Sequence, residues 1–356
     1  MDCIFITLLV RPDVKCNKAT SDIWRNWTAK TSLSNGILVL MKKISILIPA
    51  YNEEAALESL YHRLGKLAND NKSYDFEFLF VNDGSRDKTL DIIKEYAETD
   101  DRVAYVNLSR NFGKEIAMIA GFDHATGDAT VIIDADLQDP PELIPKMIKY
   151  WEDGYDDVYA KRISREGETW FKKSSSQWFY RILQKSTNIP IQIDTGDFRL
   201  LDRCCVEALK QIRESQRYTK GMFSWIGYKK KEITYNRDPR IAGESKWNYI
   251  KLFNFAIDGI TSFTTAPLRI SSILGAIVSL IAFVFIVIIV IKTALFGDPV
   301  AGYPSLMAVV LFLGGIQLLS LGIIGEYIGR IFNETKGRPL YFIEEYHHSK
   351  SSKKTR

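Results

Sequence analysis

The sequence predicts an α/β fold, with a mostly parallel sheet covered by flanking helices, followed by a hairpin of two membrane-spanning helices. Two observations lead to this prediction. From residue 44 to residue 133, short apolar runs alternate with segments of helical periodicity, a pattern typical of a parallel sheet covered by helices. After residue 270, two long apolar runs each reach the length that crosses the hydrocarbon core of a bilayer.

The predicted strands are short, apolar and often β-branched, whereas the helices repeat apolar residues every three to four positions. We expect strands at 44–48, 76–81, 103–108, 129–133 and 157–160, and helices at 53–69, 89–98 and 113–126. In such sheets, ligands bind beyond the carboxyl ends of the strands. The turns that follow the first four strands are therefore the expected site.

The hairpin is predicted from residues 273–291 and 304–325, which are joined by a short loop. Basic residues flank its outer ends, at Arg269 on one side and at Arg330 and the tail 350–356 on the other. Basic flanks favour the cytoplasmic side. We therefore expect an integral membrane protein with both chain ends, and everything before residue 270, in the cytoplasm. A buried core helix is the alternative for each span.

The remaining composition narrows the class of protein. A net charge of +4 over 356 residues is too small to indicate nucleic-acid binding. The four cysteines show no metal-binding spacing, which favours a reducing compartment. We expect five regions in order: a poorly structured extension (1–40), a cytoplasmic α/β domain (41–246), interfacial helices (247–269), the hairpin (270–330) and a cytoplasmic basic tail (331–356). Whether residues 1–40 belong to the native protein stays open.

The most informative motif is Asp134-Ala-Asp136, which follows the predicted strand 129–133 and precedes Pro140-Pro141. Two carboxylates at this spacing can share a divalent cation, and Mg²⁺ often combines one or two carboxylates with substrate phosphates. A nucleoside diphosphate is the expected phosphate ligand. An ordinary surface loop is the alternative.

Four segments together resemble the family 2 glycosyltransferases of the GT-A fold. They are Ile46-Leu-Ile-Pro-Ala-Tyr-Asn-Glu-Glu54, Val81-Asn-Asp-Gly-Ser85, Leu108-Ser-Arg-Asn-Phe-Gly-Lys114 and Asp134-Ala-Asp-Leu-Gln-Asp139. With the hairpin, the chain more narrowly resembles polyprenyl-phosphate glycosyltransferases, which include dolichol-phosphate mannose synthase and the bactoprenol glucosyltransferases. The resemblance runs from about residue 43 to about residue 340, and it implies a location at the inner membrane of a bacterial cell.

The resemblance implies how the donor is held. Pro49, Tyr51 and Glu53 would frame the base and ribose, and Asp83 would accept a hydrogen bond from the base. Asp83 has an alternative role as the capping residue of an Asn-Asp-Gly turn. Gly113 and Lys114 open a helix whose amide groups would face the phosphates, although Lys114 is also compatible with a solvated surface.

The resemblance also implies a metal site. Asp134, Asp136 and Gln138 would gather around Mg²⁺ or Mn²⁺, which would neutralise charge on the departing nucleotide, so Asp136 is also expected to be catalytic. On the acceptor side, Asp197 is predicted to lie in a turn over 194–199 and to act as a base or orienting group. A plain turn carboxylate is the alternative.

Three further predictions concern loops and the membrane surface. A loop over 240–247 would close over the diphosphate through Arg240, Ser245 and Lys246. The lipid phosphate would meet basic residues after the strand 157–160, namely Arg162, Lys172 and Lys173. Residues 247–267 suit interfacial helices or helices packed on the soluble domain.

The sequence therefore predicts an inverting transferase that moves one sugar, with glucose favoured, from a nucleoside-diphosphate sugar to polyprenyl phosphate. We expect UDP rather than GDP. Transfer to a protein or another sugar, and a non-catalytic partner of a flippase, are the alternatives. Oligomerisation is expected through small residues of the second apolar run, which are Gly314, Gly315, Gly322 and Gly325.

Overall fold

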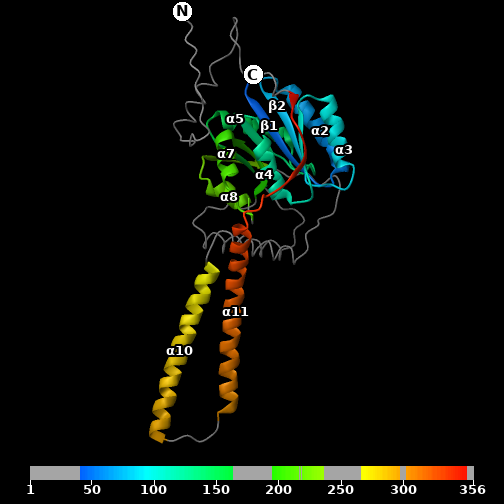
Figure 1. Cartoon of the computed structure of the whole chain (residues 1–356). Helices are drawn as coiled ribbons and strands as arrows, with labels where there is room; N and C mark the ends of the chain where they lie inside the picture. Colours follow the sequence, from blue (N-terminus) through cyan, green and yellow to red (C-terminus); the bar gives the residue numbers. More distant parts are fainter. Residues whose placement is uncertain are drawn as a thin grey trace, which may run out of the picture.

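The computed structural model describes residues 41–162, 195–215, 217, 219–235, 266–296 and 302–350. An α/β domain lies at one end of the molecule, and two long helices extend away from it (Figure 1). The predictions for residues 1–40, for Lys172 and Lys173, and for the segment 236–265 lie outside the described residues.

Within the described residues, the strands form one eight-stranded sheet in the order β7-β5-β6-β4-β1-β2-β3-β8. Neighbours β1 and β2, β1 and β4, β2 and β3, and β5 and β7 are parallel, which confirms the predicted mostly parallel sheet. The strands are β1 (Lys43–Ala50), β2 (Asp75–Asn82), β3 (Val103–Leu108), β4 (Ala129–Ile132), β5 (Asp157–Arg162), β6 (Thr195–Asp202), β7 (Lys230–Tyr235) and β8 (Ile343–His347).

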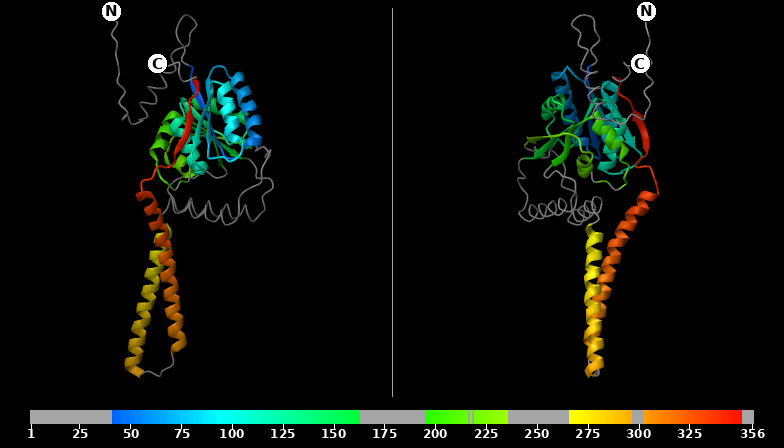
Figure 2. Two further views of the ribbon diagram at one scale, coloured as in Figure 1. Left: turned by 45° about the vertical axis from the view of Figure 1, so that its right-hand side comes forward. Right: turned by 90° about the vertical axis from the view of Figure 1, so that its left-hand side faces the viewer.

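Helices cover both faces of the sheet, and each face has its own apolar core. On one face lie α2 (Glu54–Asp70), α3 (Thr89–Thr99) and α5 (Ile144–Glu152), which follows the short 3₁₀ helix η1 (Pro141–Leu143). On the other lie α4 (Lys114–His124), α7 (Arg203–Gln211) and α8 (Thr219–Trp225). Figure 2 shows these layers from two further sides.

Helix α2 illustrates how the sequence pattern sets the packing. Leu57, Leu60 and Leu64 recur at helical spacing and are fully buried, so they form the stripe that faces the sheet. Replacing a fully buried leucine by alanine typically costs about 2–5 kcal/mol. Burial of apolar side chains between the helices and both faces of the sheet therefore supplies most of the stability of the domain.

The two long helices are α10 (Ala266–Phe296) and α11 (Tyr303–Thr335). They contain the two predicted spans and continue beyond them at both ends. Leucine, isoleucine, valine and phenylalanine side chains are exposed along both helices. Within α11, Phe312–Thr335 is long and apolar enough to cross a membrane by length and composition, and Ile270–Phe285 of α10 is a shorter apolar stretch.

After α11 the chain returns to the α/β domain, where β8 pairs antiparallel with β3. Asn107 donates a side-chain hydrogen bond to Glu344 (3.1 Å), and the Tyr105 hydroxyl donates to Glu345 (2.6 Å). At the base of the hairpin, Ser215 donates from its amide and its hydroxyl to Glu334, at 2.8 and 2.6 Å. The segment predicted only as a basic tail thus contains the last strand of the sheet.

A buried carboxylate ties this C-terminal segment to the start of the sheet. Glu77, which is 2 % exposed, accepts hydrogen bonds from Ser45, from the ammonium of Lys43 (3.1 Å) and from the Ser349 hydroxyl (3.0 Å). It also accepts from the amide (3.0 Å) and hydroxyl (2.7 Å) of Thr126. A buried charge is tolerated when it is paired and hydrogen-bonded in this way.

Replacing Glu77 with glutamine is expected to destabilise the α/β domain by about 3 kcal/mol or more, because an amide donor would face these donors and leave Lys43 buried without its partner. The thermal unfolding midpoint of the purified protein should fall by roughly 6–12 °C. Glu152→Gln is the control, since Glu152 forms a half-exposed pair with Lys42 worth at most about 1 kcal/mol. Equal shifts in the two variants would contradict this account.

Candidate functional site

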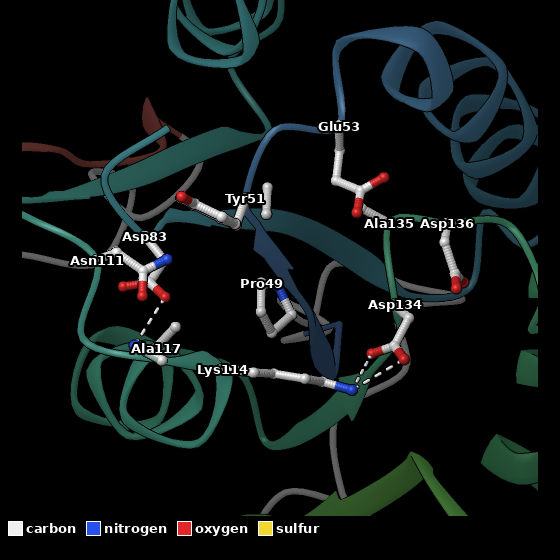
Figure 3. A pocket seen from close by; sticks show the side chains of 12 residues that line it. Pro49, Tyr51, Glu53, Asp83, Asn111, Lys114, Ala117, Asp134, Ala135 and Asp136 are labelled. Atoms are coloured by element: carbon white, nitrogen blue, oxygen red, sulfur yellow. Dashed lines mark hydrogen bonds and ion pairs between the residues drawn. The ribbon is translucent and has the colours of Figure 1, made fainter. Parts of the chain in front are cut away.

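A cavity of about 330 Å³ lies at the carboxyl ends of β1, β2 and β4, where the sequence predicts the site. Its lining includes most of the predicted donor-binding residues (Figure 3): Pro49, Tyr51, Glu53, Asp83, Gly113, Lys114, Asp134 and Asp136. It also includes Asn111 and Ala117, which the sequence analysis did not single out. Asn111 stands inside the motif that precedes α4, whereas Ala117 carries no recognisable sequence signal.

The loops that follow β2 and β3 are held together by Asp83. Its two carboxylate oxygens accept hydrogen bonds from the amides of Phe112 (2.7 Å) and Gly113 (2.9 Å). Gly84 has a φ of +64°, and a β-carbon there would lie 2.5 Å from the carbonyl carbon of Arg110. Only glycine permits both this conformation and this approach.

Asp83 therefore caps the neighbouring loop rather than its own turn. The carboxyl group is 3 % exposed, and burial raises its pKa, although the amide bonds from Phe112 and Gly113 oppose that shift. Each carboxylate oxygen can accept more than one hydrogen bond. Because Asp83 also lines the cavity, it can support the loop and still present an acceptor to a ligand.

Three charged groups meet at the other side of the cavity. The ammonium nitrogen of Lys114 lies 2.6 Å from a carboxylate oxygen of Asp134 and 2.6 Å from one of Asp197. Partial desolvation by the surrounding protein would lower the pKa of Lys114, but the two carboxylates raise it above its ordinary value, and 42 % of the side chain remains exposed. Lys114 is thus a protonated bridge between the donor-side motif and the predicted acceptor-side residue.

The predicted turn at Asp197 is wrong, because Asp197 is the third residue of β6. The strand forms because β6 lies between β5 and β4 and pairs with both. Arg199 lies on the same face of β6 as Asp197 and is fully buried. Its guanidinium group forms an ion pair with the buried Asp157 carboxylate, with nitrogen and oxygen 3.1 Å apart, and its central carbon lies 3.8 Å from the centre of the Phe223 ring. This buried pair fixes the strand that carries Asp197.

The charges around Asp197 keep it ionised. Burial would raise its pKa, but Lys114 and then Lys220 lower it below its ordinary range. Glu115 lies nearby and accepts hydrogen bonds from the amide (3.1 Å) and hydroxyl (2.8 Å) of Thr219. Burial raises the pKa of Glu115 to about 7, with Asp197 adding to the shift. The sequence analysis missed Glu115, whose role of holding the start of α8 depends on tertiary contacts.

The predicted metal-binding loop brings both of its carboxylates to the cavity, which Asp134 and Asp136 both line. The backbone amide of Gln138 donates a hydrogen bond to the Asp136 carboxylate at 3.2 Å. Between them and Gln138, Leu137 has a φ of +58°, which is uncommon for a residue with a side chain. Gln138 is not among the residues that line the cavity.

These residues fit a divalent cation. The two carboxylates supply hard oxygen ligands beside a cavity, and Asp134 already binds one positive charge, the ammonium of Lys114. A divalent cation in place of that ammonium would meet the same oxygens of Asp134 and would add one positive charge beside the carboxylate of Asp136.

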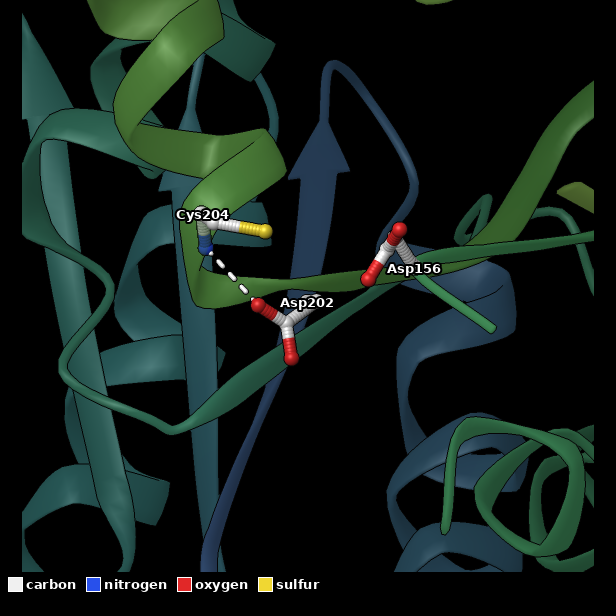
Figure 4. Close-up of side chains that lie close together, drawn as sticks. All are labelled: Asp156, Asp202 and Cys204. Atoms are coloured by element: carbon white, nitrogen blue, oxygen red, sulfur yellow. Dashed lines mark hydrogen bonds between the residues drawn. The ribbon is translucent and has the colours of Figure 1, made fainter. Parts of the chain in front are cut away.

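A second group of potential ligands lies elsewhere, at Asp156, Asp202 and Cys204, whose ligand atoms are within 4.8 Å of one another (Figure 4). The carboxylate oxygens of Asp202 already accept from the Cys204 amide (2.9 Å) and the Trp151 indole (2.7 Å). Asp156 accepts from the Lys229 amide at 3.1 Å. Asp202 is the N-cap of α7, so these contacts give the cluster a structural role.

Of the residues predicted to meet a lipid phosphate, only Arg162 lies in the described part of the chain. It ends β5 and lies beside Tyr235, whose hydroxyl donates to the buried Asp139. Arg162 is not among the residues that line the cavity. The other predicted phosphate-binding residues lie outside the described ranges: Lys172, Lys173, Arg240, Ser245 and Lys246.

Comparison with known proteins finds family matches in two regions of the chain. Residues 45–209 match the family model described as Glycosyl transferase family 2, and residues 266–331 match the GtrB C-terminal hairpin. An uncharacterized glycosyltransferase of Synechocystis sp. is 50 % identical over 303 residues, covering 85 % of this chain and 95 % of that protein.

Two further relatives have more specific names. A prophage bactoprenol glucosyl transferase homolog of Escherichia coli is 46 % identical, over 85 % of this chain and 98 % of its own. A bactoprenol glucosyl transferase of Shigella phage SfX is 45 % identical, over 85 % and 99 %. These matches confirm the resemblance, and the hairpin match indicates membrane association. This chain is therefore a member of glycosyltransferase family 2 that carries the GtrB-type C-terminal hairpin.

Proposed function

We propose that this protein transfers one glucose from UDP-glucose to a polyprenyl phosphate at the cytoplasmic face of a membrane, with inversion at the sugar. The observation that carries the proposal is the ion triad of Lys114, Asp134 and Asp197, which joins a nucleotide-sized cavity to a carboxylate on the neighbouring strand. The glucosyl transferase relatives support the choice of sugar and lipid.

Each residue has a defined part in this proposal. Tyr51, Glu53 and Asp83 hold the nucleoside, and the α4 amino end with Lys114 faces the diphosphate. Mg²⁺ or Mn²⁺ held by Asp134 and Asp136 would neutralise charge on the leaving nucleotide. Asp136 lies beside the cavity with Asp134 and is catalytic in this sense.

The acceptor needs orientation more than deprotonation. A lipid phosphate is already ionised near neutral pH, so it can attack the sugar without a general base. Asp197 stays ionised beside Lys114, and its charge would orient the acceptor and stabilise positive character on the sugar ring. Positioning of the two reactants and electrostatic stabilisation then supply most of the rate.

The hairpin explains why a lipid is the favoured acceptor. Helices α10 and α11 expose apolar side chains along their lengths, and the contact of Ser215 with Glu334 links the end of α11 to the α/β domain. In our proposal both helices span the bilayer with the chain ends in the cytoplasm, following the basic residues that flank the hairpin. A protein or sugar acceptor would not require this attachment.

Turnover of UDP-glucose with a short polyprenyl phosphate tests the proposal directly, with the lipid-linked product measured by mass spectrometry. Asp136→Ala and Asp197→Asn should each lower kcat by about 100-fold or more, because each removes charge that acts on the reacting groups. Asp70→Asn, an exposed change at the end of α2, should leave the rate unchanged. Transfer only to a protein or to free sugar would reject the lipid acceptor.

Asp83→Asn is expected to weaken UDP binding by roughly 10-fold. An asparagine can accept from only one of the amides of Phe112 and Gly113 and turns a donor toward the other, a change worth about 1–2 kcal/mol. Titration calorimetry with UDP measures the affinity, and Asp70→Asn at the exposed end of α2 is the control. Unchanged UDP affinity would mean that the order of this loop does not govern nucleotide binding.

A further inference from the structure

The ion triad follows from the register of two antiparallel strands. Ile132 of β4 pairs with Arg199 of β6. Continuing that register by two residues places Asp134 opposite Asp197, and like charges opposite each other on neighbouring strands repel. The ammonium of Lys114, 2.6 Å from both carboxylates, offsets that repulsion. The protein thus supplies its own cation at the place where the proposed function needs a divalent one.

Two cations cannot share Asp134 at these distances. A divalent ion bound to its oxygens would lie within a few ångströms of the lysine ammonium, and the two positive charges would repel each other. The Lys114 side chain is 42 % exposed, so it can turn away with little loss of packing. Asp197 would remain compensated, because Lys220 also acts on it.

We propose that Lys114 is a displaceable internal counter-ion, which occupies the cation position at Asp134 in the ligand-free protein and leaves it when a divalent ion binds with a nucleoside diphosphate. This inference rests on the proposed function and adds a mode of regulation to the same site. Asp134 is the shared ligand in both states: it binds the lysine ammonium in one and the divalent ion in the other.

The nucleotide is the natural second partner for the displaced lysine. Lys114 lines the same cavity as Asp83 and Tyr51, so a diphosphate there offers its ammonium new acceptors. Divalent ion and nucleotide would then favour each other's binding through Lys114, and by thermodynamic linkage this coupling is reciprocal. Without nucleotide, the lysine competes with the ion and keeps its affinity low.

Mn²⁺ binding to the full-length protein tests this inference without any turnover, by the loss of the free Mn²⁺ signal in electron paramagnetic resonance. Affinity is measured without UDP and with saturating UDP. Without UDP, Lys114→Met is expected to bind Mn²⁺ at least 10-fold more tightly than the native protein, because the competing ammonium is gone. The gain in Mn²⁺ affinity on adding UDP should be at least 10-fold smaller in the variant.

Lys149→Met is the matched control, since Lys149 is exposed on α5 and does not line the cavity. It should behave as the native protein does. Lys114→Gln, which keeps a polar side chain, should reproduce the effect of Lys114→Met, and thermal unfolding of each variant shows whether it is folded.

Unchanged or weaker Mn²⁺ binding by folded Lys114→Met without UDP would overturn the inference. Failure of both Lys114 variants to fold would also overturn it, because a cation that the fold cannot release is not displaceable. The proposed function is tested separately: it would be rejected if the native protein transferred no glucose, whatever the Mn²⁺ affinities are.

Discussion

Parallel pairing of β1 with β2 and β4 directs the carboxyl ends of these strands to one edge of the sheet, and the site depends on that constraint. Tyr51, Asp83 and Asp134 follow three different strands, yet they line one cavity. The same edge gathers negative charge, because each loop contributes a carboxylate. The charge at this edge must therefore be balanced: Lys114 offsets the carboxylates of Asp134 and Asp197 in the structure, and a metal ion would do so in the proposed reaction.

The sequence predicted the first half of the domain well, because its strands are apolar on both faces and its helices carry a clear periodic stripe. The loops after β1, β2 and β4 followed directly from that alternation. Asp197 was placed in a turn because Asp194-Thr-Gly-Asp197 has turn composition, whereas pairing on both sides makes it a strand. The bridge from Lys114 to Asp134 and Asp197 depends on strand register, which composition does not encode.

Strand β8 was not predicted from the sequence, for a different reason. Its sequence, Ile-Glu-Glu-Tyr-His, has little apolar content and no clear alternation, as suits an edge strand that is half exposed. Its stability comes from particular partners, including Tyr105 and Lys94, which both contact Glu345. Just after the strand, the Ser349 hydroxyl donates a buried hydrogen bond to Glu77. The C-terminal segment is thus part of the catalytic domain's structure, although the hairpin separates the two in sequence.

Because β8 follows the hairpin in the sequence, it is synthesised after both long helices. A ribosome completes β1 to β7 first, then both apolar helices, and releases the strand that covers the edge of β3 last. Among the described strands, the outer edge of β3 has no other partner, so the nascent sheet stays open until both helices of the hairpin have been made. Maturation of the enzyme is thereby tied to completion of the hairpin, and a chain interrupted between the two helices carries an uncovered edge that recruits other strands.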